Sequence, residues 1–266
     1  MPSKRKARLD VLLVERGLAE TRSKAQALIR AGEVTVDGRL LDKPGMTVSA
    51  DAEVAVRAPA PYVSRGGYKL AAALDAFDID PSGSVCLDVG ASTGGFTDVL
   101  LQRGAALVYA VDVGRGQLAW RLRGDSRVVS MERTDVRSLE ALPRPVDLAT
   151  IDVAFISLRR VLPSVRPLLR DDGAAIALVK PQFEAGRDQV GRGGIVRDAQ
   201  VHRQVLLDLL DHAADSGWLV GGAAASPITG AAGNREFLVL LAMPGADLAS
   251  LTPEDAVTAA LGSLGD

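Results

Sequence analysis

The sequence predicts an α/β protein with a mainly parallel, doubly wound sheet, preceded by a small α+β domain. From residue 64 onward, short β-rich runs alternate with stretches of helical periodicity. This alternation is typical of the strand–helix–strand units that build a parallel sheet. Before residue 58 the elements are shorter and more basic, and the proline-punctuated segment APAPY at residues 58–62 separates the two parts.

The composition narrows the class of protein. Of 266 residues, 47% are apolar and 24% charged, as in a globular chain. A single cysteine, Cys86, and two histidines predict neither a disulfide framework nor a structural zinc site. No apolar run reaches the roughly 18–20 residues that span a bilayer, and no apolar core follows the basic start. We therefore expect a cytoplasmic protein that binds no metal and no membrane.

Charge is distributed unevenly along the chain. Residues 1–69 hold 13 basic and 8 acidic side chains, a net charge of +5, whereas the remainder holds 18 and 25, a net charge of −7. A basic segment on an acidic body indicates contact with a polyanion; the alternative is an ordinary solvated charged face.

We predict an α+β domain over residues 1–58, a linker over 59–63 and a larger domain over 64–266. In the first domain, one helix begins at Leu9 and ends before Gly17. A second helix covers 22–31, with Thr21 or Ser23 as its cap, and short strands follow around Val34 and at 53–57. Basic side chains that could bind phosphates are spread over the two helices: Arg5, Arg8, Arg16, Arg22, Lys24 and Arg30.

The larger domain reads as a seven-stranded sheet. The runs SVCLDVG, ALVYAVDVG, RVVSM, VDLATID and AAIALVK predict five strands, and two more lie near 218–225 and 235–242. Helical stretches are expected near 66–77, 94–103, 116–123, 158–169, 199–214 and 253–263.

A glycine-rich turn joins the first strand of this sheet to a helix, in LDVGASTGGF at 87–96. Glycines allow a sharp turn and close approach of a ligand, but the spacing matches neither the dinucleotide fingerprint nor a P-loop. Asp112 closes the next strand, where it could hold ribose hydroxyls. The pattern resembles the S-adenosylmethionine site of Rossmann-like methyltransferases; the alternative is a glycine-rich turn in another α/β enzyme.

In this interpretation Asp88 faces the ammonium group of the ligand and Asp135 touches its adenine, although Asp135 could equally be a helix cap. The expected cofactor-binding residues are Asp88, Gly90, Ser92, Thr93, Gly94, Gly95, Phe96, Asp112, Val113, Asp135 and Asp152.

Four further polar residues stand at informative places: Lys69, Asp152, Lys180 and Glu236. Asp152 and Lys180 close the fourth and fifth strands, and the carboxyl ends of such strands line the ligand crevice. Only two of six lysines lie beyond residue 43, in a chain with 25 arginines. A buried lysine can lose its proton, whereas arginine cannot, so these two lysines are candidates for proton chemistry.

The order Lys, Asp, Lys, Glu resembles the K-D-K-E tetrad of ribose 2′-O-methyltransferases of the RrmJ/FtsJ type. The segments VSRGGYKL, VDVGRGQLAW, ERTDVR, DVAFISL, LVKPQFE and GNREFL, together with the glycine turn, are similar to the TlyA family. Residues 8–38 resemble an S-four-type RNA-binding domain. The resemblance covers nearly the whole chain.

This resemblance implies a Rossmann-like methyltransferase that uses S-adenosylmethionine to methylate the 2′-hydroxyl of cytidine in ribosomal RNA or ribosomal subunits. Lys180 would be the base, with Lys69, Asp152 and Glu236 as electrostatic and orienting partners. Arg65 would join the basic residues of the first domain in binding RNA. Related proteins carry a basic, tryptophan-containing linker where this chain has Ala60, Pro61 and Tyr62.

Other functions stay open at this point. The family carries an old label, hemolysin, so a membrane-acting protein is one alternative, although the sequence offers no spanning segment. A non-catalytic RNA-binding factor is another. A pseudouridine synthase carries a similar first domain but needs no glycine-rich cofactor turn.

Overall fold

The computed structural model describes residues 5–57 and 60–262, and the chain divides into two compact units, Met1–Pro61 and Tyr62–Asp266. We call these the N-terminal and C-terminal units. The predicted end of the first domain at residue 58 and the predicted start of the linker at residue 59 lie outside the described residues, as does position 263 of the last predicted helix.

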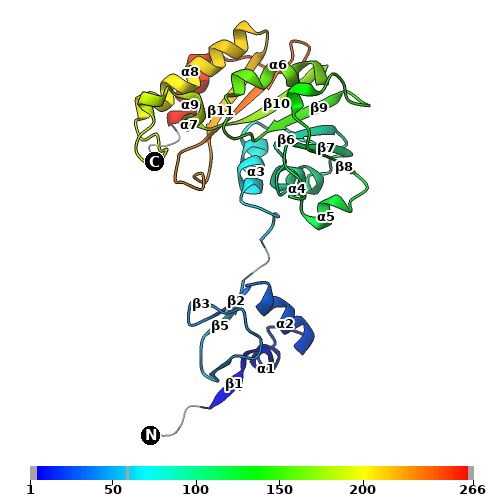
Figure 1. The fold of residues 1–266 in the computed structure, drawn as a ribbon, viewed down its shortest axis with the longest axis vertical. Helices are drawn as coiled ribbons and strands as arrows, with labels where there is room; N and C mark the ends of the chain where they lie inside the picture. The colour runs from blue at the N-terminus through cyan, green and yellow to red at the C-terminus, as the bar shows by residue number, and fades with distance from the viewer. Residues whose placement is uncertain (1–4, 58–59, 263–266) are drawn as a thin grey trace. The chain divides into compact units, whose positions relative to one another are not determined.

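The N-terminal unit packs two helices on short strands (Figure 1). Its elements are β1 (Lys6–Arg8), α1 (Leu9–Glu15), α2 (Arg22–Arg30), β2 (Val34–Val36), β3 (Arg39–Leu40), β4 (Thr47–Ser49) and β5 (Val54–Val56). Both predicted helices are present, and the Thr21 side chain caps α2 by accepting a hydrogen bond from the Lys24 amide. Leu9, Leu13 and Ile29 are fully buried in a core that belongs to this unit alone.

The C-terminal unit confirms the expected mainly parallel sheet of seven strands. The strands are β6 (Val85–Val89), β7 (Leu107–Asp112), β8 (Val128–Glu132), β9 (Val146–Ile151), β10 (Leu169–Val179), β11 (Leu219–Ala225) and β12 (Phe237–Ala242). Their order across the sheet is β11-β12-β10-β9-β6-β7-β8. The pairs from β10 to β8 are parallel, and β12 runs antiparallel to both of its neighbours.

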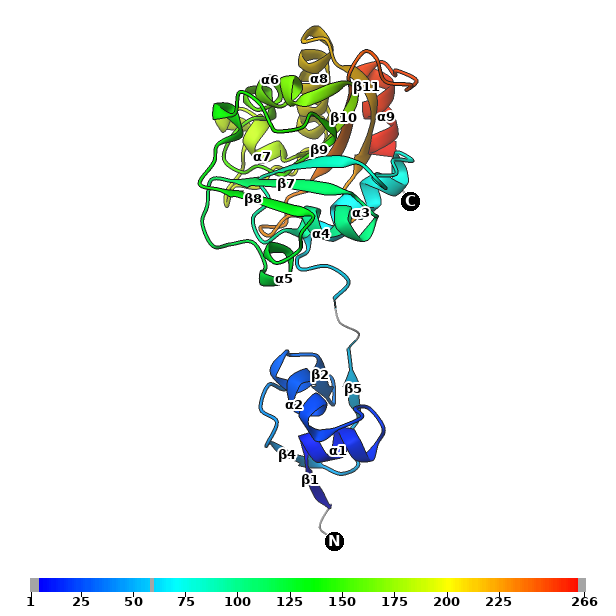
Figure 2. The ribbon, with the colours of Figure 1, turned by 90° about the vertical axis from the view of Figure 1, so that its right-hand side faces the viewer.

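Helices cover both faces of this sheet (Figures 1 and 2). One face carries α3 (Gly66–Ala76), α4 (Gly95–Gln102) and α5 (Trp120–Arg123), whose apolar side chains share one core. The other carries α6 (Leu162–Val165), α8 (Ala199–Asp215) and α9 (Pro253–Gly262), which share a second core. Short elements complete the unit: α7 (Pro181–Glu184) and the 3₁₀ helices η1 (Val136–Ser138), η2 (Leu158–Arg160), η3 (Arg166–Leu168) and η4 (Arg187–Gln189).

Two predicted helices are shorter than expected. The stretch 116–123 is helical only from Trp120, because Gly116 has φ +69° and belongs to the preceding turn. The stretch 158–169 breaks into η2, α6 and η3, with Pro163 and Pro167 each placed in the first turn of a new helix. In the described part of the chain, no helix combines the length and apolar character needed to cross a bilayer.

Strand register decides which residues reach the same edge of the sheet. In the parallel pair of β6 and β9, Val89 lies opposite Ile151, so Gly90 and Asp152 leave the sheet together. In the antiparallel pair of β10 and β12, Val179 lies opposite Phe237. The residue after the end of β10, Lys180, and the residue before the start of β12, Glu236, therefore belong to the same edge.

Candidate active site

The glycine turn between β6 and α4 forms the floor of the site. Gly90 has φ +81°, and a Cβ placed there would lie 2.4 Å from the carbonyl oxygen of Asp152. Gly94, at φ +93°, is the N-cap residue of α4, and Ser92 also adopts the left-handed region at φ 49°. Glycine at position 90 is thus required both by its conformation and by the close approach of the next strand.

Asp112, at the end of β7, fixes this turn. Its Oδ2 accepts a hydrogen bond of 2.8 Å from the Ser92 amide, and its Oδ1 accepts one of 2.6 Å from the Gly114 amide. The carboxylate also lines the large cavity described below.

Asp88 does not lie where we expected it. It lies on the face of β6 that α4 covers, and its side chain is fully buried. Its Oδ2 accepts hydrogen bonds from the amide and hydroxyl of Thr97, at 2.9 and 2.6 Å, and its Oδ1 accepts one from the Thr150 hydroxyl. Burial raises the pKa of Asp88 to about 7. Asp88 therefore stabilises the start of α4 and lines neither of the two cavities described below.

Asp135 has the capping role that was considered for it, whereas its contact with the adenine of the ligand stays a prediction. Its side chain caps η1 by accepting a hydrogen bond from the Arg137 amide, and it pairs with the Arg137 guanidinium, which lowers its pKa. It also lines the large cavity.

A cavity of about 660 Å³ opens at the carboxyl edge of β6, β7 and β9. Its lining includes the predicted Gly90, Ser92, Asp112, Val113, Asp135 and Asp152. A smaller cavity of about 130 Å³ shares Gly90, Ser92 and Asp152 with it and adds Lys69, Thr93, Gly95 and Phe96. Together the two cavities have an apolar wall, the carboxylate of Asp112 and an exposed glycine turn. These features fit a ligand that contains a nucleoside.

Lys180 and Asp152 form an ion pair at this edge. The Lys180 Nζ lies 2.5 Å from Asp152 Oδ1 and donates a hydrogen bond of 2.9 Å to the carbonyl oxygen of Val153. Asp152 Oδ1 accepts no hydrogen bond among the described residues, so the contact with Lys180 is electrostatic without hydrogen-bond geometry. Both side chains retain some exposure, 13% for Lys180 and 24% for Asp152.

Lys69 and Glu236 form a second, more deeply buried pair. Lys69 comes from α3 and donates a hydrogen bond to Glu236 Oε2. Glycines bring α3 to this position: a Cβ on Gly95 would lie 2.2 Å from the Ser64 hydroxyl and 3.1 Å from the Gly67 amide. The four predicted polar residues thus meet at one edge of the sheet, with Lys69 and Asp152 lining one cavity.

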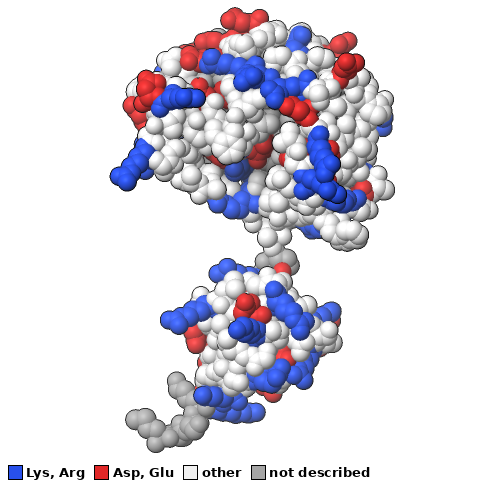
Figure 3. Space-filling view, in the orientation of Figure 1, with Lys and Arg blue, Asp and Glu red and all other residues white. Residues whose placement is uncertain are grey.

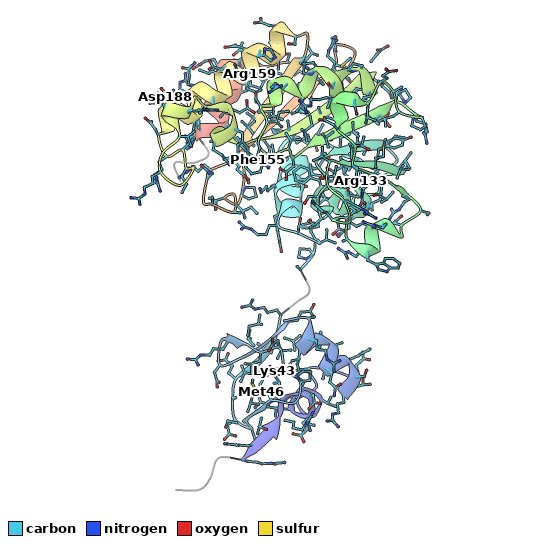
Figure 4. All side chains as sticks on the ribbon, viewed as in Figure 1. Lys43, Met46, Arg133, Phe155, Arg159 and Asp188 are labelled. Atoms are coloured by element: carbon cyan, nitrogen blue, oxygen red, sulfur yellow. The ribbon has the colours of Figure 1, made fainter. Side chains whose placement is uncertain are left out.

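Sequence analysis assigned no role to an aromatic pair beside these residues. Phe155, in the loop after β9 (Figure 4), has φ +63° and is 90% exposed. Its ring lies 5.0 Å from that of Phe183 in α7. Phe155 also lines the large cavity. The available signal was an aromatic residue just after a strand-ending aspartate in a chain that is only 4% aromatic.

The predicted basic residues differ in how firmly they are held. Arg8 and Arg22 both donate to the fully buried carboxylate of Asp10, and Arg16 donates to the carbonyl oxygens of Ala50 and Ala52. Lys24 pairs with Glu20, and Arg65 donates to the Thr229 carbonyl. The side chains of Arg5 and Arg30 are exposed and have no hydrogen bond or ion pair to any residue in 5–57 or 60–262.

Comparisons with known proteins agree with this arrangement. A family model described as FtsJ-like methyltransferase matches residues 62–243, and one described as S4 domain matches residues 7–54. A putative rRNA methyltransferase from Bacillus subtilis, YqxC, is 52% identical over 248 residues, covering 91% of this chain and 87% of that protein.

Two further proteins extend these matches. The 16S/23S rRNA (cytidine-2′-O)-methyltransferase TlyA of Mycobacterium tuberculosis is 49% identical over 241 residues, covering 89% of this chain and 90% of that protein. A solved structure described as a putative hemolysin from Streptococcus thermophilus is 44% identical, with a TM-score of 0.71 and 96% of each chain covered. Since both the fold and the sequence match over most of their length, this chain belongs to the FtsJ-like methyltransferase family and carries an S4 domain before its methyltransferase domain.

Proposed function

We propose that this methyltransferase transfers a methyl group from S-adenosylmethionine to a ribose 2′-hydroxyl of ribosomal RNA, at cytidine. The observation that carries the proposal is the Lys180–Asp152 ion pair, in which Asp152 lines the large cavity together with Gly90. The names of the relatives, YqxC and TlyA, support the RNA substrate and, for TlyA, the cytidine 2′-hydroxyl.

S-adenosylmethionine would be held by the two adjoining cavities. Asp112 offers a carboxylate to ribose hydroxyls, while Val113 and Asp135 line the same cavity for the base. Gly90, Thr93 and Gly95 line the smaller cavity, where the amino-acid part would lie. When bound, this cofactor supplies a methyl group on a sulfonium, which is already a good leaving group.

The residues of the chain then have two tasks, alignment and proton removal. Alignment of the reacting groups is worth roughly 7–11 kcal/mol, and general-base catalysis about two to four powers of ten. Lys180 is the base: its ammonium first releases a proton to solvent, and the neutral Nζ then accepts the proton of the ribose hydroxyl. Asp152 and the Val153 carbonyl oxygen fix the position of that nitrogen.

Lys69 and Glu236 act as the orienting pair. Because the pair is buried and hydrogen-bonded, it fixes the start of β12 against α3 and sets the field around the reacting atoms. Lys69 also lines the smaller cavity. Its role in the proposal is to orient the ribose toward Lys180.

The RNA would be bound by basic side chains and by exposed aromatic rings. Figure 3 shows a hollow on the face of the C-terminal unit with charged side chains inside it and Lys and Arg side chains around its rim; Arg137 and Arg160 line the large cavity. The N-terminal unit adds Arg5 and Arg30, whose side chains pair with no other described residue, and Arg8, Arg16, Arg22 and Lys24 as further candidates. The C-terminal unit adds Arg65. Phe155 and Phe183 offer a stacking surface for a nucleotide turned out of its helix. A ribosomal substrate implies that the enzyme works in the cytoplasm.

Purified ribosomal subunits incubated with enzyme and methyl-labelled S-adenosylmethionine test the proposal. We expect label in 2′-O-methylcytidine after nuclease digestion and a matching stop in reverse transcription. Label in a methylated base, or none in RNA, contradicts it. Leakage of dye-loaded liposomes under the same conditions would instead favour the membrane-acting alternative that the hemolysin label of the Streptococcus structure raises.

A further inference from the structure

Glu184 lies at the end of α7 and holds a distant part of the chain. Its Oε2 accepts a hydrogen bond of 2.6 Å from the Ser157 hydroxyl, and its Oε1 accepts one of 2.7 Å from the Leu158 amide. The carboxylate is half-buried, and the Leu158 side chain beyond it is in the core. One side chain therefore joins the segment after β10 to the segment after β9.

The same two segments meet at two other points in matching order. Lys180 contacts Val153 and Asp152, and the ring of Phe183 contacts the ring of Phe155. Glu184 makes the third contact of the series, at the end farthest along both segments. The proposed base and its carboxylate partner lie at the other end of this series.

The loop between these contacts is strained. Phe155 has φ +63°, a region that L-amino acids with large side chains rarely adopt, and such a residue persists only where its surroundings hold it. The ring is 90% exposed, so burial of the ring does not supply the restraint. At the start of the loop the Asp152 amide donates to the Val89 carbonyl oxygen; at its end Glu184 holds Ser157 and Leu158.

The loop also forms one wall of the large cavity. Val153, Ala154, Phe155 and Ile156 line it, and Arg160 and Val161 line it just beyond the residues that Glu184 holds. Release of the loop end would therefore change both the wall and the alignment of Asp152 with Lys180.

We propose that Glu184 is a positioning residue for methyl transfer: its two hydrogen bonds hold the strained loop 152–158 so that Asp152 and Lys180 stay aligned. Glu184 itself touches neither the substrate nor the cofactor in this role. The inference rests on the proposed methyl transfer at Lys180.

The test compares Glu184→Ala with Glu184→Gln and with Glu140→Ala, which removes an exposed carboxylate. A displacement of about 1 Å costs about 100-fold in rate. We expect Glu184→Ala to lower kcat at least tenfold, and to change KM for the RNA and Kd for S-adenosylmethionine by a smaller factor than kcat. Glutamine can still accept from the Leu158 amide and donate to the Ser157 hydroxyl, so Glu184→Gln should restore kcat to within about threefold of the wild type.

Hydrogen exchange of amides 152–158 gives a second readout that needs no substrate. We expect faster exchange there in Glu184→Ala, with no change in Glu140→Ala and little in Glu184→Gln. Unchanged exchange overturns the inference whatever the activity, and so does a kcat that follows only the folded fraction. A wild-type enzyme that methylates no RNA refutes the proposed function. Faster exchange confined to amides 152–158 in Glu184→Ala would still show that Glu184 holds the loop.

Discussion

Lys180 and Glu236 reach the same edge of the sheet because β10 and β12 run antiparallel, with Val179 opposite Phe237. Lys180 directly follows β10, and Glu236 directly precedes β12. Because the two strands are antiparallel, these two positions lie at the same end of the strand pair. Each is paired with a partner from elsewhere, Lys180 with Asp152 and Glu236 with Lys69. The proposed site thus consists of two lysine–carboxylate pairs, with Asp152, Lys180 and Glu236 next to strand ends and Lys69 on α3.

Because the Lys69–Glu236 pair is buried, single and double variants of it should differ in their free energy of unfolding. Removing one partner leaves an uncompensated charge, so Lys69→Met and Glu236→Gln should each lower the free energy of unfolding by about 3–5 kcal/mol. The double variant should recover much of this loss, because no buried charge remains unpaired. Urea unfolding of the four proteins measures the coupling, and additive losses would contradict a mutually dependent pair.

Gly90 tests the cavity floor. Gly90→Ala combines a positive φ with a Cβ 2.4 Å from the Asp152 carbonyl oxygen. Gly116→Ala is a matched control, since Gly116 has φ +69° but no atom within 4 Å of the added Cβ. Both should pay about 1–2 kcal/mol for the conformation. Only Gly90→Ala should also weaken S-adenosylmethionine binding, by at least tenfold in calorimetry; equal affinities in the two variants would refute the assignment.

Asp88 predicts a pH dependence of stability. Its pKa is about 7 in the folded protein against 3.8 for the free side chain, so the folded state binds more protons between these values. Its contribution is therefore present in full below pH 3.8 and is lost as the pH rises through about 7, at up to about 1.4 kcal/mol per pH unit.

Asp88→Asn removes this titration and keeps the oxygen that accepts from Thr97. From pH 5 to pH 8, urea unfolding should show the variant gaining stability relative to the wild type. Carboxylates that do not interact with Asp88 titrate equally in both proteins and cancel. A constant difference between the two proteins over this range would rule out a buried, titrating Asp88.

Arg5 and Arg30 test the RNA-binding role of the S4 domain. Their exchange for glutamine should lower RNA affinity and reduce the slope of log affinity against log salt by about 1 for each lost phosphate contact. Arg170→Gln is the control, because Arg170 lies near the start of β10, at the edge of the sheet away from the proposed site, and pairs with Asp147 and Asp172. It should leave the slope unchanged; filter binding at several salt concentrations separates the cases.

Much of this arrangement was predictable from the sequence. Apolar runs ending in Asp112, Asp152 and Lys180 gave both the strands and the edge at which these charges meet, since parallel strands present their carboxyl ends together. The glycine turn was predictable because its spacing excluded other nucleotide motifs. These inferences depend on local patterns.

The remainder depends on contacts between distant residues. Asp88 stands near the end of its strand, as the other predicted acidic residues do, but the alternation of side chains along β6 directs it toward α4. The local sequence does not show that Asp88 accepts a hydrogen bond from Thr97. The contacts of Phe155, Phe183 and Glu184 form only where the segment after β9 lies beside the segment after β10. That arrangement depends on the packing of the whole sheet. The two prolines and one glycine that shortened predicted helices, Pro163, Pro167 and Gly116, are visible in the sequence. The helical periodicity of these stretches nevertheless predicted longer helices.

Lys180→Arg tests the central claim most directly. Arginine keeps the positive charge beside Asp152 but cannot release a proton at working pH, so it separates a base from a merely electrostatic group. In single-turnover assays with ribosomal RNA substrate and labelled S-adenosylmethionine, we expect the rate of transfer to fall by about two to four powers of ten. The Kd for the cofactor should stay within threefold of the wild-type value. A variant that methylates at close to the wild-type rate would contradict the assignment of Lys180 as the base.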